Sequence, residues 1–224
     1  MRPRHKKHLT ERMEACADNL ISIPGDARDY REVIKEADYI DTAAYFGNDN
    51  PIHMEIGCGM GTFVVTMAAR HPELNFVAVE VVADVIVVAA EKARAAGLKN
   101  VLFVRVDAIY LPKYFEPQSI ERLYLNFSCP YPKNAYRRHR LTHRKFLSLY
   151  KMLLTPAGDL HQKTDNRHFF EFSLMEFSAD GWTLQDVSLD LHNDPQKYPD
   201  NIITEYESRF LKLGQPIYRL EVKP

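Results

Sequence analysis

Between residues 51 and 165 the chain alternates short β-rich runs with segments of helical periodicity, and this alternation restricts the fold more than any other feature. Strands that alternate with helices along the chain favour a parallel sheet covered by helices. The expected fold is α/β: a doubly wound, mostly parallel seven-stranded sheet closed by an antiparallel strand hairpin. The expected strands are residues 52–57, 75–80, 101–107, 122–128, 159–165, 182–191 and 217–222, and the expected helices are 62–71, 83–97, 142–154, 167–179 and 204–213.

The 224 residues correspond to one domain, which we expect over 51–224, preceded by an N-terminal extension over 1–50 that is basic at its start. No apolar stretch approaches the ~18 residues of a membrane span, and no signal-peptide pattern is present. We expect a soluble, cytoplasmic monomer or homodimer with no membrane partner. Three widely spaced cysteines indicate a reducing compartment, and arginines around His139 and His143 favour a basic surface over a metal site.

Charge is unevenly distributed along the chain, although the formal net charge is only −1. The 37 residues of 122–158 contain eight Lys or Arg and no Asp or Glu, whereas about five acids would be expected there. Residues 1–12 add five basic residues against one acid, Glu11. Two basic segments on an acidic chain indicate local binding of a polyanion, with nucleic acid as the leading candidate. The alternative is a solvated helix face.

A glycine-rich turn follows the first expected strand. Gly57, Gly59 and Gly61 occupy every second position, which lets the backbone turn sharply and leaves room for a ligand. The dinucleotide fingerprint requires glycine at position 62, where this chain has threonine, so NAD is not expected.

Acidic residues stand at the ends of the first three strands, where open parallel sheets bind their ligands. Glu80 can accept hydrogen bonds from both hydroxyls of a ribose, Asp107 from an adenine amino group, and Glu55 can face an ammonium group. These acceptors, without a phosphate cradle, favour S-adenosylmethionine over a dinucleotide.

Longer motifs extend over most of the chain. They are residues 55–61 (EIGCGMG), 125–133 (LNFSCPYPK), 137–142 (RRHRLT), 163–166 (KTDN) and 204–207 (TEYE). With these motifs, in this order, the chain resembles the bacterial tRNA (guanine-N7-)-methyltransferases, the TrmB-type enzymes. Residues 25–45 carry no motif that we can place.

The resemblance implies a class I methyltransferase fold that transfers a methyl group from S-adenosylmethionine to N7 of guanosine 46 in the tRNA variable loop, leaving S-adenosylhomocysteine. It implies cofactor binding through Glu55, Gly57, Gly59, Gly61, Glu80, Asp107 and Asn126. It implies substrate binding through Lys133, Arg137, Arg138, Asp165, Thr204, Glu205, Tyr206 and Glu207, with the arginine-rich stretch after Lys133 holding phosphates.

Three of these residues carry carboxylates that can accept from the N1–H and N2–H₂ groups of guanine: Asp165, Glu205 and Glu207. Each also has an ordinary structural explanation. Asp165 follows a strand and can cap the next helix, and the two glutamates can be first-turn acids that the helix dipole favours.

One departure from the family pattern bears on catalysis. The family motif reads Asp-Pro-Trp-Pro-Lys, and its Asp is assigned as catalytic, whereas this chain has Cys129 at that position and Tyr131 in place of the Trp. A neutral thiol cannot stabilise the positive charge that develops on the purine, and losing one such group commonly costs about 10²–10³ in rate. The leading interpretation is thus a methyltransferase with weakened catalysis. The alternatives are a tRNA-binding paralogue without turnover and an RNA methyltransferase of other specificity.

Overall fold

A computed structural model describes residues 8–193 and 195–224 of the protein. The chain divides after Tyr114 into two compact units. The first unit contains strands β1 to β4 and the second contains strands β5 to β8. The basic residues at the start of the chain, Arg2, Arg4, Lys6 and Lys7, lie outside the described residues.

Four parallel strands form the sheet of the first unit, in the order β1-β4-β3-β2. They are β1 (Leu20–Ser22), β2 (Ile52–Ile56), β3 (Asn75–Glu80) and β4 (Val101–Arg105). Every residue of β2 is buried, as are all but the last residues of β3 and β4. Such continuous burial is typical of parallel strands that are covered on both faces.

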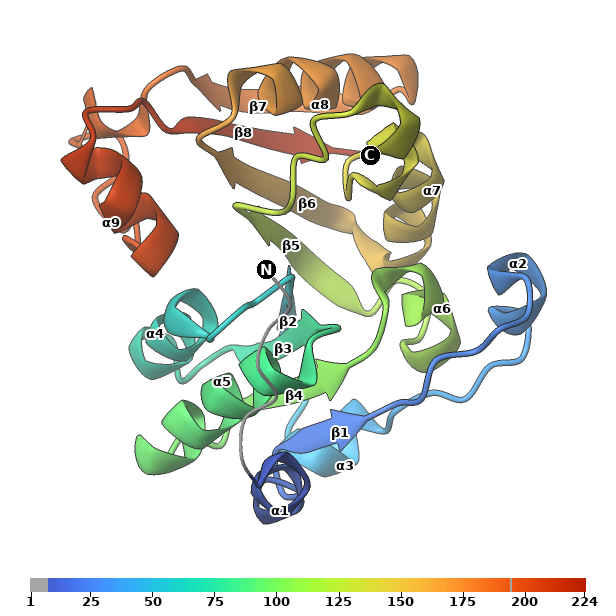
Figure 1. Cartoon of the computed structure of the whole chain (residues 1–224). Helices are drawn as coiled ribbons and strands as arrows, with labels where there is room; N and C mark the ends of the chain where they lie inside the picture. The colour runs from blue at the N-terminus through green and yellow to red at the C-terminus, as the bar shows by residue number, and fades with distance from the viewer. Residues whose placement is uncertain (1–7, 194) are drawn as a thin grey trace. The chain divides into compact units, whose positions relative to one another are not determined.

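Two helices, α4 (Thr62–Arg70) and α5 (Ala83–Ala95), pack against these strands and against each other (Figure 1). Helix α5 ends where Gly97 adopts a φ of 70°, which favours glycine. The apolar core between helices and sheet includes Val64, Ala68, Phe76, Ala78, Ile86, Ala89, Ala90, Ala93, Val101 and Phe103. The shorter helices of this unit are α1 (Leu9–Ala15), α2 (Tyr30–Val33), α3 (Thr42–Phe46), the 3-10 turn η1 (Ala108–Tyr110) and α6 (Leu111–Tyr114).

The sheet of the second unit has the order β5-β6-β8-β7, with β5 (Ile120–Asn126), β6 (Leu154–Thr164), β7 (Thr183–Ser188) and β8 (Tyr218–Lys223). Strand β5 is parallel to β6, and β8 is antiparallel to both β6 and β7. Helix α8 (Arg167–Ala179) packs on β6, β7 and β8, and α7 (Arg144–Leu153) packs beside it (Figure 1). The remaining elements are η2 (Asn134–His139), η3 (Leu191–Asn193) and α9 (Glu205–Lys212).

The α/β class, the mostly parallel pairing and the antiparallel end of the chain are confirmed. The described residues contain eight strands rather than seven, because the three-residue strand β1 comes from the N-terminal 50 residues and pairs with β4. A strand this short carries no readable period, so the sequence did not predict it. The boundary at residue 50 stays a prediction.

The expected start of one helix is wrong, and one basic residue of the N-terminal segment is already paired. Helix α7 begins after His143, whose Nδ1 accepts from the Lys145 amide at 3.2 Å. Thr142, at which the expected helix 142–154 begins, is buried, and its hydroxyl lies 2.9 Å from that of Ser173. Arg12, counted among the basic residues of the N-terminal segment, makes a bidentate ion pair with Glu91 of α5, with 2.5 and 2.6 Å between donor and acceptor atoms. Its charge is therefore already neutralised within the protein.

Candidate active site

The glycine turn after β2 has the conformation that the sequence predicts. Gly57, Gly59 and Gly61 have φ values of 82°, 55° and 77°, in the left-handed region that side chains disfavour. A Cβ on Gly61 would lie 2.5 Å from the Cβ of Ala89, so this glycine lets α4 approach α5. A Cβ on Gly57 or Gly59 would meet no described atom within 4 Å. The first half of the turn thus borders open space that a ligand can fill.

Glu80, the last residue of β3, has its carboxylate fixed beside this turn. One oxygen accepts from the Gly59 amide at 3.2 Å, and the other accepts from the amides of Val81 and Val82 at 2.8 and 3.1 Å. A carboxylate has about four acceptor positions and three are occupied here, so the oriented group can still accept from a ribose hydroxyl.

Two carboxylates, those of Glu55 and Glu80, lie close to the glycine turn. Glu55 lies within β2 and is only 3% exposed. Burial raises the pKa of the Cys58 thiol well above its usual value, and the charges of Glu55 and Glu80 raise it further. Cys58 is therefore a neutral thiol at physiological pH, and the two carboxylates favour a cationic ligand at this end of the sheet.

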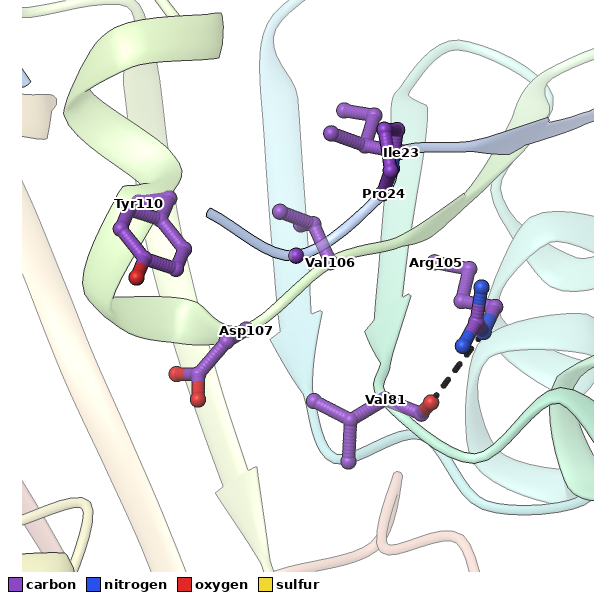
Figure 2. A pocket seen from close by; sticks show the side chains of 8 residues that line it. Ile23, Pro24, Val81, Arg105, Val106, Asp107 and Tyr110 are labelled. Carbon is purple, nitrogen blue, oxygen red and sulfur yellow. Dashed lines mark hydrogen bonds between the residues drawn. The ribbon is translucent and has the colours of Figure 1, made fainter. Parts of the chain in front are cut away.

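An open pocket lies at the carboxyl end of β4 (Figure 2). Asp107 is exposed there, and one of its oxygens accepts from the Ile109 amide at 3.0 Å. Arg105 closes one side by donating to the carbonyl oxygen of Val81 at 3.3 Å. Apolar walls with a carboxylate at the edge suit a flat ring that carries an amino group. The lining residues are Ile23, Pro24, Gly25, Val81, Arg105, Val106, Asp107 and Tyr110.

Sequence reasoning missed one wall of this pocket. Residues 23–25 follow β1, and the Ile23 amide continues the pairing with β4 by donating to the Arg105 carbonyl at 3.0 Å. No local pattern marks this segment as part of a binding site, because only the pairing of β1 with β4 brings it there.

In the second unit, the loop after β5 carries the candidate catalytic position. Cys129 is exposed in this loop, and buried Asn126 ends the strand before it, in register with Lys163 of β6. Phe127 and Tyr131 both have positive φ values, 51° and 40°. Left-handed backbone at bulky residues costs energy and is concentrated at functional sites.

Arg140 contradicts the expectation that the arginines after Lys133 hold phosphates. Its side chain is buried, and its guanidinium donates to the carbonyl oxygens of Pro130 and Tyr131 at 2.8 and 3.0 Å. Its central carbon lies 4.4 Å from the centre of the Phe172 ring. Arg140 is thus committed to the protein interior.

Lys133, Arg137 and Arg138 lie differently, since all three are exposed on η2 or at its start. We call these three residues the η2 basic surface. Tyr136, which is half-exposed, lies among them. This mixture of cations and an aromatic ring suits a nucleic-acid backbone.

The start of α9 is more buried than the resemblance suggests. The Thr204 hydroxyl caps the helix by accepting from the Glu207 amide at 3.1 Å. The Glu207 carboxylate is 0% exposed and accepts from the Lys163 ammonium at 2.8 Å and from the Asn201 side chain at 2.6 Å, while His192 Nε2 lies 3.1 Å away. Both side chains therefore have structural roles in this arrangement, which does not favour direct contact with substrate.

Three other predicted substrate residues remain accessible. Glu205 is exposed, and Tyr206 is 60% exposed. The Tyr206 ring stacks near that of Phe127, with 6.4 Å between centroids and 16° between planes. Asp165 follows β6 and is half-buried, and burial raises the pKa of its carboxyl group. It does not cap α8, because the side chain of Asn166 accepts from the Phe169 amide at 2.8 Å instead.

Residues 8–193 and 195–224 contain neither a cluster of metal ligands nor a membrane-spanning helix. Over these ranges no group of three or more His, Cys, Asp or Glu side chains is placed to hold a metal ion. None of the helices described is both long enough and apolar enough to cross a membrane.

Comparison with known proteins decides the family. Residues 49–220 match a family model described as "Putative methyltransferase". Over its whole length the chain is 42% identical to the tRNA (guanine-N(7)-)-methyltransferase of Lactococcus lactis subsp. cremoris (strain SK11), of which it covers 98%. The chain belongs to this methyltransferase family. The enzyme of the same name from Bacillus subtilis (strain 168) is 43% identical over the whole chain, which covers 99% of it.

Solved structures agree at the level of the fold. The chain superimposes on a structure titled "Structure of an Antibiotic Related Methyltransferase" with a TM-score of 0.57 and 16% identity, covering 88% of this chain and 96% of that one. At this identity the likeness establishes the class I methyltransferase fold alone. The open turn at Gly57 and Gly59, the oriented Glu80 and the pocket at Asp107 fit the cofactor that this family uses, S-adenosylmethionine.

Proposed function

We propose that the protein transfers the methyl group of S-adenosylmethionine to N7 of a guanosine in tRNA, in the cytoplasm. The observation that carries this proposal is identity above 40% with tRNA (guanine-N7-)-methyltransferases over the full length of the chain. The family resemblance extends the proposal to guanosine 46 of the variable loop.

The first unit holds the cofactor in this proposal. The backbone at Gly57 and Gly59 lies along it, Glu80 accepts from its ribose hydroxyls, and Asp107 accepts from its adenine amino group. Glu55 supplies negative charge opposite its ammonium group. When bound, the cofactor supplies a methyl group on a positively charged sulfur, which is electrophilic without further activation.

The second unit binds the RNA. The η2 basic surface holds phosphates, which positions the tRNA without reading its sequence. Asp165 accepts from the N1–H and N2–H₂ edge of the target guanine, and the exposed Tyr206 ring, supported by Phe127, offers a face for stacking. Stacking of a base on an aromatic side chain is worth about 1–3 kcal/mol.

For the reaction itself, the main task of the protein is to position N7 of the guanine in line with the methyl group. N7 of guanine carries a lone pair, so no base has to remove a proton before it attacks the methyl carbon in line. The purine becomes positively charged as the bond forms, and a nearby carboxylate would stabilise that charge. Cys129 is an exposed thiol at the position where the family has Asp, so we propose that it leaves the enzyme active but slow.

The test is methyl transfer from labelled cofactor to unmodified tRNA, with the product nucleoside identified by mass spectrometry and Cys129→Asp measured in parallel. We expect N7-methylguanosine from the natural chain and a rate about 10²-fold higher, or more, from Cys129→Asp. A different methylated nucleoside from both would refute the proposed specificity.

A second function is favoured by Cys129 itself: a protein that binds tRNA and cofactor without turnover. In that case the natural chain yields no product while Cys129→Asp does. Binding of tRNA by the inactive natural chain would then be its function.

A further inference from the structure

The loop between β5 and η2 has a conformation that its own residues do not favour. Tyr131, two residues after Cys129, has a φ of 40°, and Phe127, two residues before it, has a φ of 51°. Neither is glycine, and such backbone persists only where the surroundings hold it. The region that positions Cys129 therefore depends on contacts from outside the loop.

Arg140 provides those contacts. Its Nε donates to the Pro130 carbonyl at 2.8 Å and its Nη2 to the Tyr131 carbonyl at 3.0 Å, so one guanidinium bridges two successive peptide groups. Only 7% of the residue is exposed. Its other face lies over the Phe172 ring of α8, at 4.4 Å, which ties the loop to a helix packed on the sheet.

The surroundings of Arg140 are unusual for a buried cation. Within the described residues Arg140 forms no ion pair with a carboxylate, and burial, together with the charge of Arg137, lowers the pKa of its guanidinium. Burying an arginine without a carboxylate partner is costly, and here its hydrogen bonds to the two carbonyl oxygens and its contact with the Phe172 ring offset that cost. A lysine could not replace it, because a single ammonium lacks the planar fork that spans two carbonyls and stacks on a ring.

We propose that Arg140 is a positioning residue for methyl transfer: it holds residues 129–132 in the reactive conformation through the Pro130 and Tyr131 carbonyls, and it does not contact RNA. This proposal rests on the methyltransferase function proposed above. It assigns Arg140 a role opposite to that of its exposed neighbours Arg137 and Arg138, although all three belong to one arginine-rich stretch.

The test compares Arg140→Gln and Arg140→Lys with Arg137→Gln. We expect both Arg140 variants to lower kcat about tenfold or more, while the tRNA dissociation constant and its salt dependence stay unchanged. Arg137→Gln should instead raise KM for tRNA and reduce the slope of log K against log[salt] by about 0.7–0.9. An equal loss of slope in Arg140→Gln would show a phosphate contact, and an unchanged kcat would show no positioning role; either overturns the proposal.

Two further measurements test the role of Arg140 even if its variants fold poorly or if the protein is inactive. Phe172→Leu keeps the arginine but removes the ring beneath it, so it should also lower kcat without changing the salt slope. Hydrogen exchange of a peptide spanning residues 127–133 should become several-fold faster in Arg140→Lys and Arg140→Gln but not in Arg137→Gln. This readout needs no activity: if neither the natural chain nor Cys129→Asp methylates tRNA, the proposed function fails, while unchanged exchange in the Arg140 variants separately refutes the role of Arg140.

Discussion

In the proposed function, Asp165 is the residue at which acid–base chemistry and recognition of guanine coincide. Burial raises the pKa of its carboxyl group, with its own backbone amide partly opposing the shift. Only the ionised form accepts from both N1–H and N2–H₂ of a guanine. A carboxyl group whose pKa is raised becomes protonated at a higher pH than an ordinary Asp. As the pH is lowered, Asp165 should therefore lose its charge, and with it the recognition of guanine, before most other carboxylates are protonated.

This predicts an acid limb in the pH profile of kcat/KM. Activity should fall as pH decreases through the raised pKa of Asp165, above the usual value near 3.9. Asp165→Asn should be slower at every pH and should lack that limb, because its amide does not titrate. Circular dichroism at each pH serves as the control for folding. An acid limb of the same position in Asp165→Asn would assign it to another group.

The glycine turn and the start of α9 show how single elements divide their residues between stability and binding. In the turn, Gly61 is required by helix packing, whereas Gly57 borders open space. At the start of α9, Thr204 is buried and caps the helix, and Glu207 is buried and pairs with Lys163. Tyr206, which lies between them, is exposed. Adjacent positions of one motif therefore have different physical roles.

The turn can be tested with a matched pair of variants. Gly61→Ala adds left-handed strain and a clash with Ala89, so it should lower the free energy of unfolding by about 3 kcal/mol. Gly57→Ala adds only the strain, about 1–2 kcal/mol, but its methyl group occupies the space assigned to the cofactor. Urea unfolding and calorimetric cofactor binding should separate the two: Gly57→Ala should bind at least about tenfold more weakly. Normal cofactor binding by Gly57→Ala would place the ligand elsewhere.

The buried pair of Lys163 on β6 and Glu207 on α9 should be a stability element. Removing either charge leaves the other buried without compensation, so Lys163→Met and Glu207→Gln should each cost about 3–5 kcal/mol in urea unfolding. The double variant should cost clearly less than the sum of the two. If Glu207→Gln abolished activity without loss of stability, the carboxylate would be a substrate ligand after all.

At the scale of the whole molecule, the proposed binding of tRNA depends on local positive charge, because the formal net charge is only −1. The structure shows which basic side chains of the two basic segments are already paired or buried within the protein. Arg12 is paired with Glu91, Arg122 with Asp159 and Arg144 with Glu176, and Arg140 is buried. Lys133, Arg137 and Arg138 of the η2 basic surface are, by contrast, exposed.

The exposure of these three cations predicts the salt dependence of tRNA binding. Replacing Lys133, Arg137 and Arg138 together by Gln should reduce the slope of log K against log[salt] by about 2. Arg144→Gln is the matched control: it removes a charge of the same basic segment that Glu176 already neutralises, at 3.0 Å, and should barely change the slope. Equal effects of the two would mean that net charge, not the surface, drives binding.

Much of the site could be predicted because its signals are local. The strand limits at β3 agree with the predicted run 75–80, and Glu80 stands at the strand end where the spacing placed it. The positive φ values of the glycine turn follow from glycine itself. Phe127 was missed, although its place directly after a strand could have drawn attention to it, because an apolar residue next to a buried strand looks like core.

The sequence by itself determined the α/β class, the order of the main strands and helices from residue 51 onward, the glycine turn and the resemblance to the family, because each depends on periodicity, residue type or spacing along the chain. Only the tertiary structure decided which charged side chains are free to act. Arg140 and Arg137 are three positions apart and alike in sequence, yet one is buried under a loop and the other exposed. Arg140 is held in the interior partly by Phe172, a residue of α8 that is distant in sequence. In the same way, Glu207 is held by Lys163 of β6. Contacts between residues so far apart along the chain leave no local pattern in the sequence.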